Sequence, residues 1–215
     1  MSREPLPPPL PPETRTVGQL VAETLRLYSD NLWRSLSLGV SLLVINQVSA
    51  GHETLVQVVI LVAGAPLMAA SYAGASAIVG KVRPDAATFV RAVVVGSLVF
   101  VPAAFLSLFF VLPAVAWLAF FGLTVPVLVI ERPGIKAALV RSLQLARADY
   151  LHALASLATL VILFGLLKLM LALLLRDLGD SGERAALGLA DLVMSPMLFL
   201  GGALLYVDQA ARAKR

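Results

Sequence analysis

The chain has 215 residues, of which 59% are hydrophobic and only 14% are charged, and its mean hydropathy is +0.89. A soluble domain averages about 45–50% apolar and about 25% charged residues, so this chain has too few polar side chains to cover a surface facing water. A soluble enzyme, a disordered protein and a nucleic-acid module are therefore poor starting hypotheses. The absence of cysteine excludes disulfides, thiolate metal ligands and cysteine nucleophiles.

Proline dominates the beginning of the chain, where six of the 13 prolines lie within the first 12 residues. Proline favours extended polyproline II structure and opposes helix, and no apolar stretch typical of a secretory signal is present. We expect residues 1–14 to form a disordered leader, with docking of its Pro-x-x-Pro spacing into an aromatic groove as the alternative.

The rest of the chain contains apolar stretches of membrane-spanning length, since a helix needs about 20 apolar residues to cross a bilayer. One of them is uncharged over 39 residues, which fits two spans divided by a turn near Leu112-Pro113. The predicted architecture is an all-α polytopic membrane protein with six transmembrane helices, drawn from residues 32–50, 54–80, 92–130 (two spans), 150–175 and 185–207.

Two shorter segments have the spacing of amphipathic helices, with apolar residues on one face and polar residues on the other. They cover residues 17–32 and 133–148. We expect both to be interfacial helices at the level of the lipid headgroups, the alternative being that each simply extends the span that follows it. The domain prediction is thus a leader at 1–14, one six-helix domain at 15–209 and a basic cytoplasmic tail at 210–215.

The basic residues predict the orientation, because cytoplasmic loops of membrane proteins are enriched in lysine and arginine. Fourteen of the 17 fall on one side of the six predicted spans, and this spread along the flanks argues against nucleic-acid binding. We expect a multi-pass membrane protein with both termini cytoplasmic. The fourteen are Arg3, Arg15, Arg26, Arg34, Lys81, Arg83, Arg91, Arg132, Lys136, Arg141, Arg147, Arg212, Lys214 and Arg215.

Polar residues inside the predicted spans are candidates for function, because burying them in a bilayer is costly. Lys168 and Asp191 fall at similar depth in consecutive antiparallel spans, so an ion pair is sterically reasonable. Asn46, Gln47 and Gln57 are predicted at the same outer depth. The five side chains line one outward-facing cavity under the functional interpretation, and they neutralise and hydrogen-bond one another under the structural interpretation.

Small residues recur every four positions in the second span, at Ala65, Ala69, Ala73 and Ala77. Such a face allows close helix approach, either within the chain or to a partner or a second copy. Pro66, Pro102, Pro126 and Pro196 also lie within predicted spans and are expected to kink them.

Motifs of known catalytic sites are missing. His52-Glu53 lacks the second histidine of a zinc-protease helix, Ser76 lacks the glycine context of a nucleophile elbow, and no phosphate-binding glycine loop occurs. We therefore expect no enzyme activity, no cofactor and no metal.

Several segments, spread over nearly the whole chain after the proline-rich leader, resemble a known family. Residues 126–134 read Pro-Val-Leu-Val-Ile-Glu-Arg-Pro-Gly, and residues 138–142 read Ala-Leu-Val-Arg-Ser. These segments, with the stretches at 17–34 and 195–208, resemble the membrane domain of bacterial glycerophosphoryl diester phosphodiesterases. The resemblance implies a six-helix bundle with interfacial helices in the bacterial inner (plasma) membrane. It implies no phosphodiesterase activity, since the chemistry of fused members belongs to a separate soluble barrel. In this chain Arg212 follows Asp208 at a longer interval than the family tends to have.

The functional hypothesis is a non-catalytic integral membrane protein, acting as a membrane domain or assembly partner within the lipid bilayer. The alternative is a small transporter or lipid-handling protein that uses the polar cluster around Lys168 and Asp191.

Overall fold

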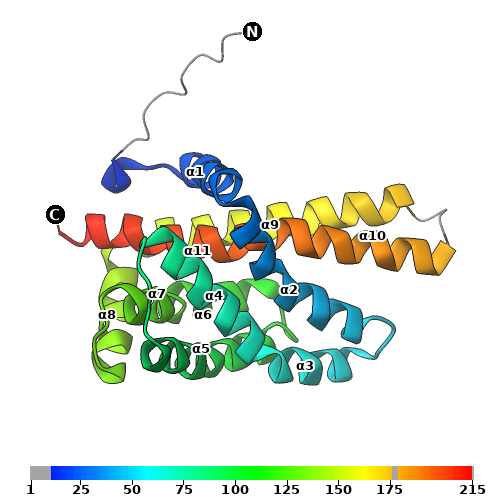
Figure 1. The fold of residues 1–215 in the computed structure, drawn as a ribbon, viewed down its shortest axis with the longest axis horizontal. Helices are drawn as coiled ribbons and strands as arrows, with labels where there is room; N and C mark the ends of the chain where they lie inside the picture. Colours follow the sequence, from blue (N-terminus) through cyan, green and yellow to red (C-terminus); the bar gives the residue numbers. More distant parts are fainter. Residues whose placement is uncertain (1–10, 176–178, 215) are drawn as a thin grey trace, which may run out of the picture.

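The computed structural model describes residues 11–175 and 179–214, and every secondary-structure element in this part is helical. Helices α9, α10 and α11 run along the long direction of the molecule, whereas α8 runs across it and α2 and α4 are inclined to it (Figure 1). In chain order they are η1 (Pro12–Thr14, a 3-10 turn), α1 (Val17–Asp30), α2 (Leu32–Ser49), α3 (Thr54–Ala63), α4 (Ala65–Val79), α5 (Ala86–Leu106), α6 (Val111–Phe121), α7 (Thr124–Ile130), α8 (Ile135–Ala148), α9 (Tyr150–Leu175), α10 (Gly179–Met194) and α11 (Pro196–Arg212).

Several of these helices are long and apolar enough to cross a membrane. Four segments qualify alone: α5, α6 with α7, α9, and the stretch Gly182–Arg212 from α10 and α11. A fifth is formed if α3 and α4, bent by 51° relative to each other, count as one broken span. The expected first span, α2, is not among them, because Arg34, Asn46 and Gln47 reduce its apolar content. The helices thus indicate a membrane-embedded protein with four to five candidate spans instead of the six expected.

The helix breaks differ in place from some of those predicted. The turn between α5 and α6 lies at residues 107–110, so the predicted turn near Leu112-Pro113 is wrong. Pro113 sits in the first turn of α6, where a missing backbone N–H removes no helical hydrogen bond. Pro66 and Pro196 lie in the first turns of α4 and α11 and mark real breaks, whereas Pro102 stays inside α5.

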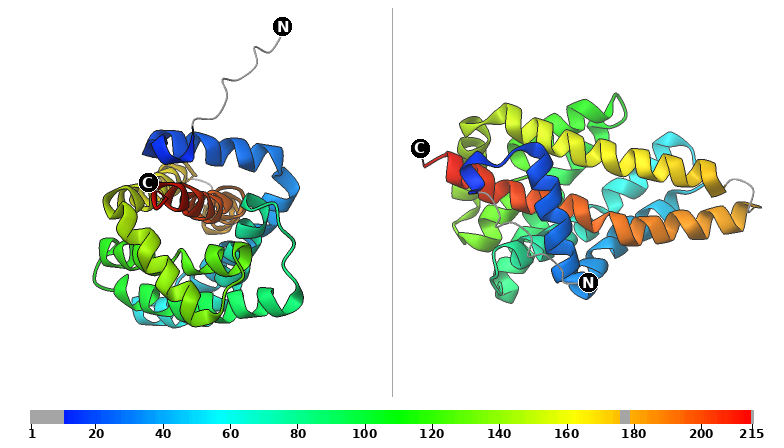
Figure 2. Two further views of the ribbon diagram at one scale, coloured as in Figure 1. Left: turned by 90° about the vertical axis from the view of Figure 1, so that its left-hand side faces the viewer. Right: turned by 90° about the horizontal axis from the view of Figure 1, so that it is seen from above.

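The two amphipathic segments are helices, as predicted. A capping box at Thr16 and Gln19 begins α1, because the two residues satisfy each other's backbone N–H groups. Helix α1 crosses over α11, and α8 lies across the end of the bundle near the C-terminus (Figures 1 and 2). The buried faces of these two helices are Leu20 and Thr24 in α1, and Ala138, Ser142, Leu145 and Ala146 in α8.

The ends of the predicted domain are also helical. Of the expected leader, residues 1–10 lie outside the described residues, and Pro12–Thr14 forms a 3-10 turn packed on α11. Helix α11 extends to Arg212, so the first residues of the expected tail continue the last helix.

Contacts between distant loops define one end of the bundle. The Arg132 guanidinium donates to the Arg83 carbonyl at 2.8 Å, which joins the α7–α8 and α4–α5 turns. The Arg212 guanidinium donates to the Arg15 carbonyl at 2.7 Å, so the chain before α1 meets the end of α11. Asp85, which caps α5 at this end, has a pKa below its usual value, chiefly because the Thr88 hydroxyl donates to its carboxylate.

The opposite end joins the end of α2 to the beginning of α10. The Gln47 side-chain amide donates to the Arg184 carbonyl at 2.8 Å. Helix α2 therefore runs from the side of the molecule where α1 lies to the end opposite the C-terminus (Figure 1).

Small residues allow the closest helix contacts. Ala65, Ala69 and Ala73 of the predicted small-residue face are buried within the chain, and Ala77 is half-buried. A Cβ atom placed on Gly96 of α5 would lie 2.8 Å from the Ala69 Cβ, so α4 and α5 leave no room for a side chain there. Backbones can approach this closely only where both surfaces are small.

Large apolar side chains cover much of the outer surface, most evenly along α9. Leu151 and Leu174, near the two ends of this helix, are 77% and 76% exposed, and Ile162, Leu166 and Met170 between them are exposed as well. Soluble monomers rarely expose apolar surface so continuously, whereas hydrocarbon is its natural environment.

Gly39 provides a test of the packing between α2 and α10. A Cβ atom on Gly39 would lie 2.1 Å from the Leu192 carbonyl oxygen, so Gly39→Ala should lower the stability of the protein by about 1–3 kcal/mol. The matched control is Gly165→Ala in α9, where a Cβ atom meets nothing within 4 Å. The melting temperature in detergent should fall for Gly39→Ala and hold or rise for Gly165→Ala, because alanine favours helix. Equal melting temperatures for both variants would contradict this packing.

Candidate functional site

A charged pair lies between three helices in the apolar part of the bundle. The Lys168 ammonium of α9 is 2.7 Å from Asp191 Oδ1 of α10. The Asn46 side-chain amide of α2 donates to Asp191 Oδ2 at 2.9 Å. Asp191 is only 1% exposed, so its carboxylate is removed from solvent and held by one cation and one amide. The structure thus brings three of the five candidate residues together.

The close approach of α2 to α10 is what positions this cluster. Gly39 faces the backbone of Leu192, and Gly188 faces the side chain of Gln47, leaving no space for a Cβ at either glycine. The two antiparallel helices therefore approach closely on both sides of Asn46, with backbone against backbone at Gly39 and a side chain against backbone at Gly188. At this separation the short Asn46 side chain reaches Asp191.

Lys168 lies at the edge of the cluster. Its side chain is 25% exposed, against 1% for Asp191, and its ammonium lies 5.6 Å from the centre of the Phe164 ring. The aromatic face adds a favourable interaction with the cation beside the carboxylate. A flexible lysine stem allows the charge to reach Asp191 while its methylene groups contact apolar surroundings.

Gln47 and Gln57 do not join the charged pair. Gln47 bonds the carbonyl of Arg184, and the Gln57 amide donates to the His52 carbonyl at 2.7 Å. Gln57 and Asn46 share an open groove of about 270 Å³ between α2, α3 and the end of α5. Neither Lys168 nor Asp191 lines this groove, so the five residues do not border one common cavity there. Its lining residues are Ile45, Asn46, Ser49, Thr54, Gln57, Val58, Leu61, Ser107 and Leu108.

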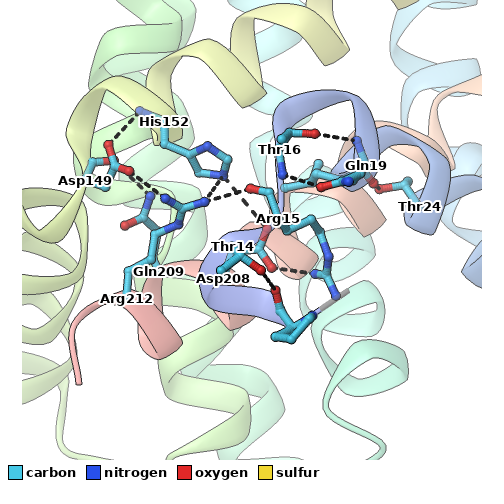
Figure 3. Close-up of polar contacts among 12 residues, drawn as sticks. Thr14, Arg15, Thr16, Gln19, Thr24, Asp149, His152, Asp208, Gln209 and Arg212 are labelled. Carbon is cyan, nitrogen blue, oxygen red and sulfur yellow. Dashed lines mark hydrogen bonds and ion pairs between the residues drawn. The ribbon is translucent and has the colours of Figure 1, made fainter. Parts of the chain in front are cut away.

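A second buried charge pair, which sequence reasoning missed, joins the two ends of the chain (Figure 3). The Arg15 guanidinium, just before α1, donates to Asp208 Oδ1 of α11 at 2.5 Å. Arg15 is 6% exposed and Asp208 is completely buried. An isolated buried carboxylate is strongly unfavourable, so Asp208 depends on this arginine.

Polar contacts extend from this pair to the junction of α8 and α9. The Arg212 guanidinium donates to Asp149 Oδ2 at 2.7 Å and to the Arg15 carbonyl at 2.7 Å (Figure 3). His152 Nε2 is 3.4 Å from Arg212 and 3.9 Å from Asp208 Oδ2. One polar network thus connects the segment before α1, the start of α9 and the end of α11. Its members are Arg15, Asp149, His152, Asp208, Gln209 and Arg212.

The sequence contained one signal for this network. Asp208 directly follows the apolar stretch of the sixth predicted span, which marks it as an acid at the edge of the bundle. Its cation is 193 residues away, so spacing alone does not identify Arg15.

Residues of the family-like motifs also meet. The Tyr206 hydroxyl donates to Glu131 Oε1 at 2.8 Å, and Arg141 Nε lies 3.5 Å from the same oxygen. The neighbouring Ser142 hydroxyl donates to the Phe120 carbonyl at 2.7 Å. These contacts link the end of α7, the middle of α8 and α11, so the motif residues act as connections between helices.

The chemistry available to these clusters is pairing and hydrogen bonding. Among the described residues, no group of three or more histidine, aspartate or glutamate side chains is placed to hold a metal ion. No family model, curated protein or solved structure matches the chain.

The charged pair is tested by removing each partner and then both. Lys168→Met leaves the Asp191 carboxylate buried without its cation. Breaking a fully buried pair lowers the free energy of unfolding by about 3–5 kcal/mol, and the loss should be smaller here because Lys168 is partly exposed. Lys168→Met with Asp191→Asn should restore part of that loss in thermal unfolding in detergent. Lys214→Met, at an exposed residue past α11, serves as the control and should change little. A double variant as unstable as the sum of the two single variants would contradict the pairing.

Proposed function

We propose that this chain is a non-catalytic integral membrane protein with six membrane spans, serving as a membrane domain or an assembly partner. Four candidate spans and the bent pair α3–α4 account for five, and α2 is the sixth. In α2, the half-buried amide of Asn46 is hydrogen-bonded to Asp191, which makes a polar residue tolerable inside a span.

The observation that carries the non-catalytic assignment is the way the intramembrane polar groups are used. Both carboxylate oxygens of Asp191 have a partner from the chain itself, and the residue is 1% exposed. A transport site needs polar groups that reach a ligand through a solvated cavity. Here the charged residues are occupied with one another, as in a structural contact between spans.

The loop contacts support an even number of spans. At one end of the bundle the Arg132 guanidinium bonds the Arg83 carbonyl, and the Arg212 guanidinium bonds the Arg15 carbonyl. At the other end Gln47 bonds the Arg184 carbonyl. The basic end corresponds to the cytoplasm under the positive-inside rule, which places both termini there. The bacterial inner membrane follows from the family resemblance.

The residues that carry the resemblance to the phosphodiesterase membrane domains connect helices. Glu131, Arg141 and Tyr206, from three separate parts of the chain, are in contact. Because these residues connect helices, the motif is compatible with a membrane domain that performs no catalysis.

The alternative, a small transporter or lipid-handling protein, is favoured by the groove beside Asn46 and Gln57. It is lined by amides, hydroxyls and apolar side chains at the end of the bundle opposite the C-terminus. A ligand path to Lys168 and Asp191 would have to open from there.

Labelling of single cysteines tests this proposal, and the natural chain is already the cysteine-free background. Ser29→Cys and Glu53→Cys flank α2, while Lys81→Cys and Lys214→Cys mark the basic end, and all four positions are exposed. With a membrane-impermeant maleimide on intact cells, Glu53→Cys should label and the other three should label only after permeabilisation. Labelling of Ser29→Cys and Glu53→Cys from the same side would contradict α2 as a span.

The same experiment separates the two functions. Asp191→Cys should stay unlabelled from both sides if the cluster is a dry contact. Rapid labelling of Asp191→Cys in a variant that still folds would contradict the structural assignment and favour the transporter.

A further inference from the structure

An open groove runs along α8 where it meets the end of α7. Its volume is about 400 Å³, and its lining repeats every three to four residues along one stripe of the helix. Helix α8 lies across the basic end of the bundle (Figure 2). The lining residues are Glu131, Pro133, Lys136, Ala137, Val140, Arg141 and Gln144.

The charge of the groove is positive. It holds two cations, Lys136 and Arg141, and one carboxylate, Glu131. The Glu131 carboxylate already accepts a hydrogen bond from the Tyr206 hydroxyl, and its Oε1 lies 3.5 Å from Arg141 Nε. The negative charge of Glu131 is therefore partly balanced within the chain. Among the described residues Lys136 forms no ion pair, and its side chain is exposed beside the groove.

Apolar side chains stand next to these cations. Val140 lines the groove and is 54% exposed, and Ile135 in the first turn of α8 is 45% exposed. The opposite face of α8, with Ala138 and Leu145, is buried against the bundle. Exposed valine and isoleucine beside an unpaired lysine are unfavourable in water but match the boundary between headgroups and acyl chains.

We propose that this groove binds the headgroup of an anionic phospholipid, with Lys136 and Arg141 holding the phosphate and with Ile135 and Val140 against the acyl chains. The inference rests on the proposed orientation, in which α8 faces the cytoplasmic leaflet. That leaflet carries anionic lipids, which are attracted by basic groups near its surface. Charge complementarity selects an anionic lipid, because a zwitterionic headgroup presents a cation to the same two basic side chains.

The test uses the full chain reconstituted in nanodiscs of phosphatidylcholine with increasing phosphatidylglycerol. Phosphatidylglycerol should raise the melting temperature of the protein, and Lys136→Gln should weaken the apparent affinity about fivefold, which corresponds to about 1 kcal/mol for one basic residue near an anionic surface. Lys136→Glu should abolish the effect. The matched control is Arg147→Gln, an exposed residue of α8 outside the groove, which should keep the wild-type response.

Three results would overturn the inference: no stabilisation by phosphatidylglycerol, an equal loss in Lys136→Gln and Arg147→Gln, or the same stabilisation by inorganic phosphate in phosphatidylcholine nanodiscs. The second result indicates diffuse surface attraction, and the third a free-anion site. Failure of the chain to insert into any nanodisc would instead contradict the proposed membrane function. Native mass spectrometry of the reconstituted protein provides a second measurement, since a retained phosphatidylglycerol should be seen in the wild type and lost in Lys136→Glu.

Discussion

The carboxylates of Asp191 and Asp208 impose the main constraint on this structure, because both are buried in a largely apolar bundle. A buried carboxylate must be neutralised, and each is met by a cation from another element, Lys168 of α9 and Arg15 before α1. The first pair joins α9 to α10 and, through Asn46, to α2. The second joins the beginning of the chain to α11. The two pairs therefore act on opposite halves of the bundle and limit which helices can be neighbours.

Part of this arrangement could be predicted from the sequence. Lys168 and Asp191 lie in consecutive antiparallel helices at similar distances from their connecting loop, so helix geometry alone places them together. The amphipathic periods of α1 and α8 are likewise local properties, and both helices form where expected. Span lengths follow from hydropathy, except where polar residues interrupt them, as Arg34 and Asn46 do in α2.

The remainder depends on contacts that no local pattern encodes. Arg15 and Asp208 are separated by 193 residues, and nothing near Arg15 marks it as buried. The turn lies at 107–110, before the predicted Leu112-Pro113, because proline fits the first turn of a helix and Pro113 occupies that position in α6. Gln57 also stays apart from the charged cluster, because its amide bonds the carbonyl of His52 in the turn before α3.

The claim that paired buried charges hold this bundle together is tested most directly by a double-mutant cycle on Arg15→Gln and Asp208→Asn. The free energy of unfolding is measured by denaturant titration in detergent micelles. Each single change should destabilise the protein by about 3–5 kcal/mol, and the double variant should be less destabilised than the sum by about 0.5–3 kcal/mol. Single variants that unfold like the wild type, or effects that add within about 0.5 kcal/mol, would contradict the account.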